Sequence, residues 1–373
     1  MKIIVIGSRG IPNIPGGVET HCEHLYPNML EDGLNDITVI CRSAYVVEKG
    51  LKEYSGIKLK TIYSPKSKSL EAIVHTFFSL IYAAFKRPDV VHIHAVGPNL
   101  LTGFARLLNL KVVMTHHGPD YKRMKWNGLA KFFLKKGEWM GVTFSKKVIV
   151  ISQEIKDLIA DLYGRKDSVL IPNGVNKPVI STDTDYIESI GLTKDRYIFT
   201  LARFVPEKGF DYMIRAYAKS SISKRYKLVI AGDADHESEY SIALKTLAKK
   251  NNVILPGFVK GEKLNQLFSS AALFILPSFY EGLPIALLEA MSYGLPILAS
   301  DIPANTQVDL PAECYFKVGN EAELTRYFDS IYLEDHKRFE YDMKRYDWKV
   351  IAAETLEVYK SIFQKSVSQY QYK

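Results

Sequence analysis

Two glutamates eight positions apart, Glu281 and Glu289, lie in the segment FILPSFYEGLPIALLEAMSYGLPILASD. The apolar run FILPS predicts the end of a buried strand, and Gly282 and Pro284 precede a helical segment that Gly294 ends. Glu281 is therefore expected in the loop, and Glu289 more than one turn inside the helix. Because open parallel sheets bind ligands beyond the carboxyl ends of their strands, each carboxylate could hold two vicinal hydroxyls, one pair on a sugar and one on a ribose. On spacing alone, the alternative is a surface acid plus an acid on a helix face.

This segment resembles the Glu-x7-Glu signature of the retaining glycosyltransferases of family 4, which have the GT-B fold. Four further segments match the family's motifs in the expected order over most of the chain: GSRGIPNIPGGVE at the start, THHGPD near residue 117, PNGV at 172–175 and ARFVPEKG up to Gly209. The first also resembles a bacterial subgroup that includes rhamnosyltransferases. The resemblance implies an α/β protein with two Rossmann-like, doubly wound parallel-sheet domains that face each other across a cleft.

Strand-like segments alternate with helical ones throughout, which is the pattern of parallel α/β sheets. In the first half the expected strands are KIIVIG, ITVICRS, IKLKTIY, DVVHIHA, KVVMTHH, KKVIVIS and VLIPNGV. In the second half they are RYIFTLAR, KLVIAGD, VILPGFV, LFILPS and PILASD.

The polar segment VNKPVISTDTDYIESIG has no sustained period and predicts a linker between the two halves. The expected domains are residues 1–177, which the resemblance makes acceptor-binding, and residues 190–347, which it makes donor-binding. The tail has helical apolar spacing. The resemblance implies that this helix, residues 348–373, crosses back to the first domain.

The chain has 373 residues, 47% of them hydrophobic and 24% charged, which is typical of an ordinary two-domain globular protein. Cys22, Cys41 and Cys314 have no metal-ligand or redox spacing, which fits a reducing cytoplasm. The N-terminal MKIIVIG runs into a glycine loop without a cleavage site, so it predicts a strand and not a signal peptide. Residues 70–86, interrupted by His75, predict a buried helix and not a membrane span.

The net charge of +8 belongs to the first half of the chain, where residues 1–175 hold 24 Lys and Arg against 15 Asp and Glu. Basic and aromatic residues alternate in residues 121–139, namely Lys122, Arg123, Lys125, Lys131, Lys135 and Lys136 with Trp126, Phe132, Phe133 and Trp139. This composition suits an interfacial helix attracted to anionic lipid. It equally suits a helix with an apolar core face and a solvated basic face. Nucleic acid is a disfavoured partner because no nucleic-acid-binding motif accompanies the charge.

Gly16 and Gly17 lie in a predicted strand-to-helix loop, with Glu19 in the first turn of the helix. Adjacent glycines let backbone amides approach an anion closely, and the helix N-terminus adds partial positive charge. A glycine pair alone is usually only a turn. The resemblance implies that Gly16 and Gly17 contact the donor phosphate or line the acceptor site.

Arg203 and Lys208 follow the predicted strand YIFTLA. Sugar transfer leaves a nucleoside diphosphate whose developing charge must be held. A forked guanidinium and a point-charge ammonium on one loop can share this task, and two solvated basic residues are the alternative. Gly209 completes the family's Arg-x4-Lys-Gly pattern, although Ala202 replaces the glycine that often precedes the Arg.

THHGPD follows the predicted strand KVVM, so His116 and His117 are expected at the carboxyl edge of a sheet. The resemblance places His117 against the donor sugar, where it hydrogen-bonds an outer hydroxyl or the sugar-side phosphate, while His116 could instead point into the fold. His92 and His94 in the preceding strand look like a metal pair. Strand alternation, however, puts both on one face of a buried strand.

The segment GDADHE superficially resembles the Asp-x-Asp motif with which other transferases hold a divalent metal. It follows the predicted strand KLVIAG, where GT-B enzymes have an ordinary loop. Asp233 and Asp235 are therefore interpreted as helix-capping and loop acids. Neither a metal nor another cofactor is expected.

The resemblance implies transfer of a sugar, with retention of configuration, from a nucleotide-sugar to a glycan or a polyprenyl-diphosphate-linked acceptor in bacterial surface polysaccharide synthesis. A UDP-sugar is favoured, with dTDP-rhamnose and GDP-mannose as the other donors. The enzyme is expected in the cytoplasm, and at the inner face of the cell membrane if its basic segment binds lipid. The alternatives are a sugar phosphorylase or epimerase on the same fold, and an inactive partner subunit that binds the nucleotide-sugar.

The resemblance also assigns roles to individual residues. Glu281 is expected to hold the sugar hydroxyls and oppose the oxocarbenium charge, Glu289 to hold the ribose diol, and the base to stack near residues 256–259. The expected catalytic residues are Glu281, His117, Arg203 and Lys208. The expected donor-binding residues are Gly16, Gly17, Asn173, Arg203, Lys208, Glu281, Gly282, Leu283, Pro284 and Glu289.

Overall fold

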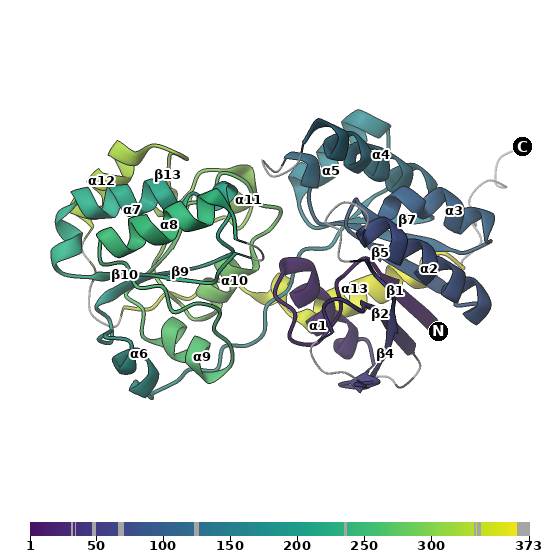
Figure 1. Cartoon of the computed structure of the whole chain (residues 1–373), viewed down its shortest axis with the longest axis horizontal. Helices are drawn as coiled ribbons and strands as arrows, with labels where there is room; N and C mark the ends of the chain where they lie inside the picture. Colours follow the sequence, from purple (N-terminus) through teal and green to yellow (C-terminus); the bar gives the residue numbers. More distant parts are fainter. Residues whose placement is uncertain are drawn as a thin grey trace, which may run out of the picture. The chain divides into compact units, whose positions relative to one another are not determined.

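The computed structural model describes residues 1–30, 33, 35–46, 50–65, 71–122, 127–234, 237–331, 333 and 337–363. The chain divides into two compact units (Figure 1). Unit 1 comprises Met1–Gly174 and Arg345–Lys373, and unit 2 comprises Val175–Lys344. Each unit contains a parallel sheet with helices packed against it, so the predicted fold class of two parallel-sheet α/β domains is confirmed.

The sheet of unit 1 has its described strands in the order β3-β4-β2-β1-β5-β6-β7-β8. Neighbouring strands are parallel except for β3 and β4. Seven of the strands were predicted, whereas the two-residue β3 is too short to have a pattern. The strands are β1 (Lys2–Ile6), β2 (Asp36–Arg42), β3 (Glu53–Tyr54), β4 (Ile57–Ile62), β5 (Val90–His94), β6 (Val112–His116), β7 (Lys147–Val150) and β8 (Val169–Leu170).

Helices cover both faces of this sheet because side chains alternate along the buried strands. Ile3 and Val5 pack into a core with α1 and α13, while Ile4 and Ile6 pack into a second core with α2 and α3. The tail helix α13 contacts α1 and belongs to unit 1. The helices are α1 (Gly17–Asn28), α2 (Glu71–Lys86), η1 (Pro98–Leu101), α3 (Thr102–Leu107), η2 (Asp120–Lys122), α4 (Gly128–Phe144), α5 (Gln153–Tyr163) and α13 (Trp348–Ser361).

The sheet of unit 2 is parallel throughout its described strands, in the order β10-β9-β11-β12-β13. These are β9 (Tyr197–Leu201), β10 (Lys227–Ala231), β11 (Leu273–Leu276), β12 (Ile297–Ser300) and β13 (Tyr315–Phe316). The helices are α6 (Asp185–Ser189), η3 (Pro206–Lys208), α7 (Phe210–Lys219), η4 (Ser221–Lys224), α8 (Glu239–Lys250), α9 (Glu262–Ser269), α10 (Ile285–Ser292), α11 (Pro303–Thr306), η5 (Ala312–Cys314) and α12 (Glu321–Ser330), with η6 (Lys344–Tyr346) at the boundary. The chain order reverses between β9 and β11, which makes their carboxyl ends the topological switch point of this sheet.

The structure corrects two expectations about the elements and adds a short helix inside the expected linker. Residues 253–259 form only an isolated bridge between Ile254 and Val229, because Pro256 has no N–H to extend a ladder. The expected linker contains the short helix α6. The helix α2 buries one face only and leaves the rings of Phe77, Phe78 and Phe85 exposed. Within the described part of the chain, no helix has both the length and the apolarity to span a bilayer.

Candidate functional site

The loops that follow β9 and β11 meet at the switch point of unit 2. Leu273 of β11 pairs in parallel register with Ile198 of β9, so both strands end at the same edge. The backbone N–H of Phe279 donates to the carbonyl of Glu207 at 2.8 Å and joins the two loops. The sequence motifs around Arg203 and Glu281, far apart along the chain, are thereby brought to one edge of one sheet.

Lys208 and Glu281 form an ion pair across these loops. The Lys208 Nζ lies 2.5 Å from Glu281 Oε1, and the side chains are only 16% and 10% exposed. The Ser278 hydroxyl donates to the same carboxylate oxygen at 2.7 Å. Glu281 is therefore held by an ammonium and a hydroxyl, and partial exclusion of water strengthens both interactions.

Gly209 is required where the two loops approach each other. Its φ of +65° is left-handed, and a Cβ there would lie 2.4 Å from the carbonyl oxygen of Pro277. The same carbonyl accepts a hydrogen bond from the Tyr212 hydroxyl at 2.5 Å. The glycine after Lys208 thus permits the close packing that sets the ammonium beside Glu281. Arg203 lies half-buried at the start of the same loop.

Glu289 is half-buried on α10, whose start is built from Gly282, Leu283 and Pro284. Burial raises the pKa of the Glu289 carboxyl to about 7. Among the described residues its carboxylate has no hydrogen bond or ion pair. The carbonyl of Gly282 accepts from Gln307 at 3.2 Å, and Leu283 is 4% exposed. A half-buried carboxylate without a partner suits a ligand that donates hydrogen bonds, such as a diol.

In unit 1, the glycine loop at the start of α1 is fixed by Arg9 and Glu19. Glu19 Oε1 accepts from the Arg9 backbone N–H at 2.9 Å and pairs with its guanidinium at 3.2 Å. A Cβ at Gly16, whose φ is +146°, would lie 2.1 Å from the Glu19 carboxylate, whereas a Cβ at Gly17 would meet open space. Gly16 therefore makes room for the ion pair, and Gly17 leaves the first turn of the helix open.

His116 points into the fold. Its ring is fully buried, its Nε2 lies 2.7 Å from Glu138, and its Nδ1 accepts from the backbone N–H of Gly118 at 3.1 Å. Burial by itself raises the pKa of Glu138, but hydrogen bonds from His116, Tyr163 and Tyr121 outweigh it and hold that pKa below its usual range. His116 is thus an anchor of α4 and not a ligand-binding group.

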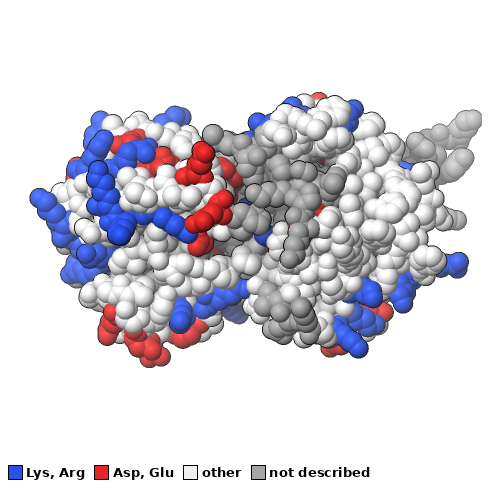
Figure 2. Space-filling view, viewed as in Figure 1, with Lys and Arg blue, Asp and Glu red and all other residues white. Residues whose placement is uncertain are grey.

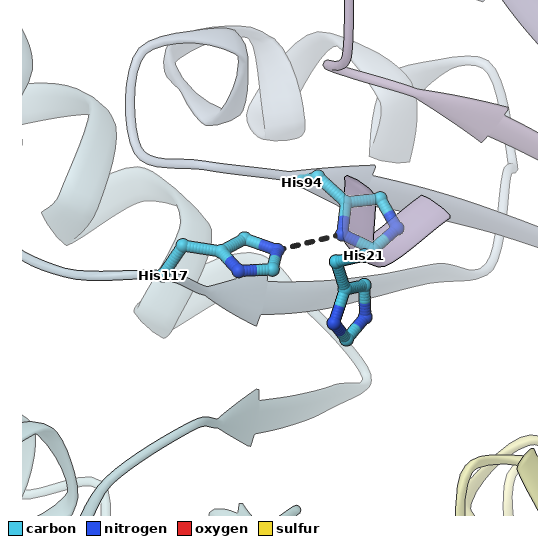
Figure 3. Close-up of side chains that lie close together, drawn as sticks. All are labelled: His21, His94 and His117. Carbon is cyan, nitrogen blue, oxygen red and sulfur yellow. Dashed lines mark hydrogen bonds between the residues drawn. The ribbon is translucent and has the colours of Figure 1, made fainter. Parts of the chain in front are cut away.

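His117 lies half-buried in a group of three histidines with His21 of α1 and His94 of β5 (Figure 3). Its Nε2 is 2.9 Å from His94 Nδ1. The His21 ring meets the His117 ring edge to face, with centroids 4.9 Å apart, and His21 Nδ1 lies 3.0 Å from Asn173 Oδ1. Asn173 is 4% exposed. Unit 1 therefore links two of the predicted site residues, His117 and Asn173, through His21.

The three histidines have the residue types of a zinc site, and one ring nitrogen of each lies within 4.8 Å of the others. Ligand nitrogens on one tetrahedral zinc lie about 3.3 Å apart, given Zn–N distances of about 2.0–2.1 Å. His94 Nδ1 and His117 Nε2 are closer, at 2.9 Å, and share a proton. The pair His92 and His94 lies fully buried with ring centroids 4.1 Å apart, as strand alternation predicted, and both rings bond the Tyr26 hydroxyl.

Asp233 is a loop acid, paired with Lys245 at 2.8 Å and accepting from the Ala234 N–H. It does not cap the following helix: Ser238 caps α8 in a capping box with Ser241. The capping role predicted for Asp233 is therefore wrong, because a serine directly before the helix performs it. Asp235 lies outside the described residues.

Sequence reasoning missed Ser278, His21 and the pairing of Arg9 with Glu19. Ser278 lies three residues before Glu281 in the sequence, so its hydroxyl could have been expected to contact the Glu281 carboxylate. His21 is 152 residues from its partner Asn173, a pairing that no local pattern shows.

Comparison with known proteins agrees with this architecture. Residues 15–177 match the family Glycosyltransferase Family 4, and residues 181–347 match the family Glycosyl transferases group 1. The chain is 28% identical over 333 residues to an uncharacterized glycosyltransferase of Methanocaldococcus jannaschii, covering 81% of each protein. It is 27% identical over 291 residues to the UDP-Gal:alpha-D-GlcNAc-diphosphoundecaprenol alpha-1,3-galactosyltransferase of Escherichia coli, covering 72% of each. Anabaena HepE in complex with UDP-glucose has a similar fold, with a TM-score of 0.78 at 18% identity over 97% of this chain and 100% of HepE.

Proposed function

The chain belongs to the glycosyltransferases of family 4 and has their GT-B fold, and on this basis we propose that it transfers a sugar with retention of configuration from a nucleotide-sugar. Unit 2 binds the donor, and unit 1 binds a glycan or lipid-diphosphate-linked acceptor of bacterial surface polysaccharide synthesis. The transfer takes place in the cytoplasm.

The observation that carries this proposal is the charged group at the switch point of unit 2. Lys208 and Glu281 are paired at 2.5 Å on loops whose strands end side by side. An ammonium that can bind a phosphate thus lies beside a carboxylate that can bind sugar hydroxyls. Phosphate and sugar are the two parts of a nucleotide-sugar on either side of the bond that breaks.

The proposed roles follow from charge. Arg203 and Lys208 hold the diphosphate, with a guanidinium fork and a point charge that stabilise the leaving group as negative charge grows on it. Glu281 accepts hydrogen bonds from sugar hydroxyls and opposes the positive charge that develops on the ring. The leaving phosphate takes the proton of the attacking hydroxyl on the same face of the sugar, so configuration is retained without a separate protein base. We also propose His117, Gly16, Gly17 and Asn173 of unit 1 as donor-binding residues.

We propose a UDP-sugar as the donor. The Escherichia coli relative is named for UDP-Gal, and HepE is described with UDP-glucose. Glu289 would bind the ribose, because a diol supplies two hydrogen-bond donors to a carboxylate that has no partner among the described residues.

The ribose role of Glu289 predicts that UDP-sugars bind more tightly as the pH rises. The free carboxyl has a pKa of about 7, raised by burial. Hydrogen bonds from the diol favour the ionised form and lower this pKa in the complex, so binding below pH 7 must release a proton. Affinity should then rise by up to about tenfold per pH unit from pH 5.5 to 7 and level off above.

Calorimetry with UDP-sugars and GDP-mannose at pH 5.5 and pH 8 measures this change. The same measurement with dTDP-rhamnose, whose deoxyribose has no diol, completes the ranking of the donors. Nucleotide-sugars are suitable probes because their diphosphate diester does not titrate in this range. Glu289→Gln should flatten the pH dependence, and Glu313→Gln, an exposed carboxylate of the same unit, should leave it intact. A pH dependence unchanged in Glu289→Gln would remove this residue from the ribose site.

We further propose that transfer needs no metal ion. Asp233 is paired with Lys245, and the facing nitrogens of His94 and His117 are hydrogen-bonded to each other. In this proposal the negative charge of the phosphates is neutralised by Arg203 and Lys208 instead of a metal ion. The rate in EDTA should therefore stay within about twofold of the rate without EDTA. Loss of a catalytic metal would instead remove several kcal/mol of transition-state stabilisation. Loss of activity in EDTA, with recovery on adding Mg²⁺, Mn²⁺ or Zn²⁺, would contradict this proposal.

The acceptor is proposed to reach the site at a membrane surface. The buried residues of α4 are Gly137, Glu138, Gly141 and Val142, while three of its aromatic residues, Phe132, Phe133 and Trp139, are exposed. Phe132 is 53% exposed, and the Lys136 ammonium lies 5.8 Å from its ring centroid. Such a mixture of exposed rings and ammonium groups suits anionic lipid better than water. Arg123, Lys125 and Trp126 lie outside the described residues.

Neighbouring helices enlarge this apolar surface. Besides Phe77, Phe78 and Phe85 of α2, Leu107 of α3 is 85% exposed. Figure 2 shows that the surface over α2 and α3 carries few charged side chains, with basic residues along its edge. The helices α2, α3 and α4 all pack on η1, and we propose that their exposed apolar side chains enter one headgroup layer.

Cosedimentation with phosphatidylglycerol vesicles tests the membrane contact. The triple change of Lys131, Lys135 and Lys136 to Glu should weaken binding more than a hundredfold at low salt, since each basic residue near the surface contributes about 1 kcal/mol. A matched triple change of the exposed Lys224, Lys227 and Lys249 to Glu alters the net charge equally but lies in unit 2. Equal binding by the two variants, or no binding by the parent, would rule out this surface as the membrane contact.

A further inference from the structure

Two donors contact the same oxygen of the Glu281 carboxylate. The Lys208 ammonium lies 2.5 Å from Oε1 and the Ser278 hydroxyl lies 2.7 Å from it, while Oε2 has no partner among the described residues. The oxygen left for a ligand is therefore Oε2. Its position depends on where the loop after β11 holds Ser278, because the Ser278 hydroxyl is bound to the other oxygen of the same carboxylate.

The neighbouring strand β12 holds the backbone of this loop at Ser278. Ala299 of β12 pairs with Leu276 of β11 in parallel register, which brings Ser300 beside the residues that follow β11. The Ser300 hydroxyl lies 2.6 Å from the backbone carbonyl oxygen of Ser278, and both residues are fully buried. A carbonyl oxygen can only accept a hydrogen bond, so the Ser300 hydroxyl is the donor.

Asn305 of α11 supports the Ser300 hydroxyl from the other side. Its Nδ2 lies 2.9 Å from the backbone carbonyl oxygen of Ser300 and 3.0 Å from Ser300 Oγ. The contact with the carbonyl requires an N–H donor, which settles the orientation of the amide, and an amide nitrogen only donates. Ser300 Oγ thus accepts from Asn305, and its own proton is directed at Ser278. Asn305 is fully buried, so bulk water does not compete for these hydrogen bonds.

From these contacts we propose that Ser300 and Asn305 are positioning residues that set the Glu281 carboxylate against the donor sugar. The inference rests on the proposed function, in which Glu281 accepts hydrogen bonds from sugar hydroxyls. Neither Ser300 nor Asn305 contacts the donor. Both act through the backbone of Ser278, whose own hydroxyl binds Glu281.

Other hydrogen bonds hold the same loop, so loss of the Ser300 hydroxyl should move Ser278 without unfolding the loop. The N–H of Phe279 donates to the Glu207 carbonyl at 2.8 Å, and Gln307 Nε2 donates to the Gly282 carbonyl at 3.2 Å. The expected effect is therefore a local displacement of Ser278 and of the carboxylate bound to it. Because a misplacement of about 1 Å can cost about a hundredfold in rate, a smaller shift is expected to cost about tenfold.

A double-mutant cycle on the rate of sugar transfer tests the proposal. Ser300→Ala alone should slow transfer by about tenfold, and Asn305→Leu, which removes the donor to Ser300 Oγ, should act in the same direction. Added to Glu281→Ala, Ser300→Ala should slow transfer by less than about twofold, because its effect depends on a carboxylate that is no longer present. A merely structural role would instead lower the rate equally in both backgrounds.

Ser220→Ala is the matched control. The Ser220 hydroxyl, in a residue that is 4% exposed, donates to the Tyr217 carbonyl at 2.8 Å in the same unit. This change therefore also removes a buried hydrogen bond from a serine to a backbone carbonyl. It should lower the thermal stability about as much as Ser300→Ala does, yet leave transfer at the parent rate.

Crystal structures of the parent and of Ser300→Ala add a readout that does not depend on activity. The variant should show Ser278 displaced and the Glu281 carboxylate moved with it. An unmoved carboxylate, or losses of rate that add in the cycle, would overturn the inference. A displaced carboxylate in a protein whose parent transfers no sugar from any nucleotide-sugar would instead contradict the proposed function and leave the positioning of Glu281 supported.

Discussion

Replacing Glu281 with Ala is expected to lower the rate of sugar transfer by at least about a hundredfold, the usual effect of losing one electrostatic stabiliser of a transition state. The carboxylate is held by Lys208 at 2.5 Å and by Ser278 at 2.7 Å, so its position is set before the substrate binds. Since Glu281 acts on the sugar half of the donor, affinity for the free nucleoside diphosphate should change only a few-fold.

Two further variants test whether the negative charge of Glu281 is responsible for the expected loss of rate. Glu281→Gln keeps the shape and can still accept from Ser278, yet it should be nearly as slow because the charge is gone. Glu313→Gln, an exposed carboxylate of the same unit, should retain the parent rate. Near-normal turnover in Glu281→Ala would show that this residue does not act on the donor sugar.

Replacing Arg203 or Lys208 with Ala should impair both transfer and diphosphate binding, in contrast to Glu281. A hydrogen bond to a charged group contributes about 1.5–3 kcal/mol, so each change should weaken binding of the nucleoside diphosphate by roughly ten- to a hundredfold. Arg203→Lys should recover only part of this loss, because an ammonium cannot bridge two phosphate oxygens as a guanidinium does.

Calorimetry with the free nucleoside diphosphate measures these affinities directly. Lys224→Ala, an exposed lysine of the same unit, serves as the matched control and should bind like the parent. The Arg203→Ala and Lys208→Ala variants differ in one respect. Lys208→Ala also removes the ion-pair partner of Glu281. Unchanged diphosphate affinity in both Ala variants would place Arg203 and Lys208 outside the binding site.

The strands were predictable from sequence because fully buried parallel strands are continuous apolar runs, as in KIIVIG of β1. The pattern failed at residues 253–259, where the apolar residues are present but Pro256 interrupts the ladder. It also failed at the two-residue β3 and β13, which exist only because a longer neighbour pairs with them. Whether these segments form strands depends on their length and on the missing N–H of Pro256, and not on their hydrophobicity.

The carboxyl-edge positions of Lys208 and Glu281 were predictable from the same strand pattern, whereas their contacts were not. Which side chain faces which depends on strand order, and strand order places β11 beside β9 although β10 lies between them in sequence. The partnership of His21 with Asn173 has the same cause, since α1 and the segment after β8 meet only in the folded unit.

The most direct test of the central claim is the configuration of the transferred sugar. A ¹H NMR spectrum of the first product formed from a UDP-α-sugar, with EDTA present, reports the anomeric configuration before any equilibration. The account predicts an α-linked product, formed by the parent and at most at a hundredth of its rate by Glu281→Ala. A β-linked product, or equal transfer by the two proteins, would contradict it.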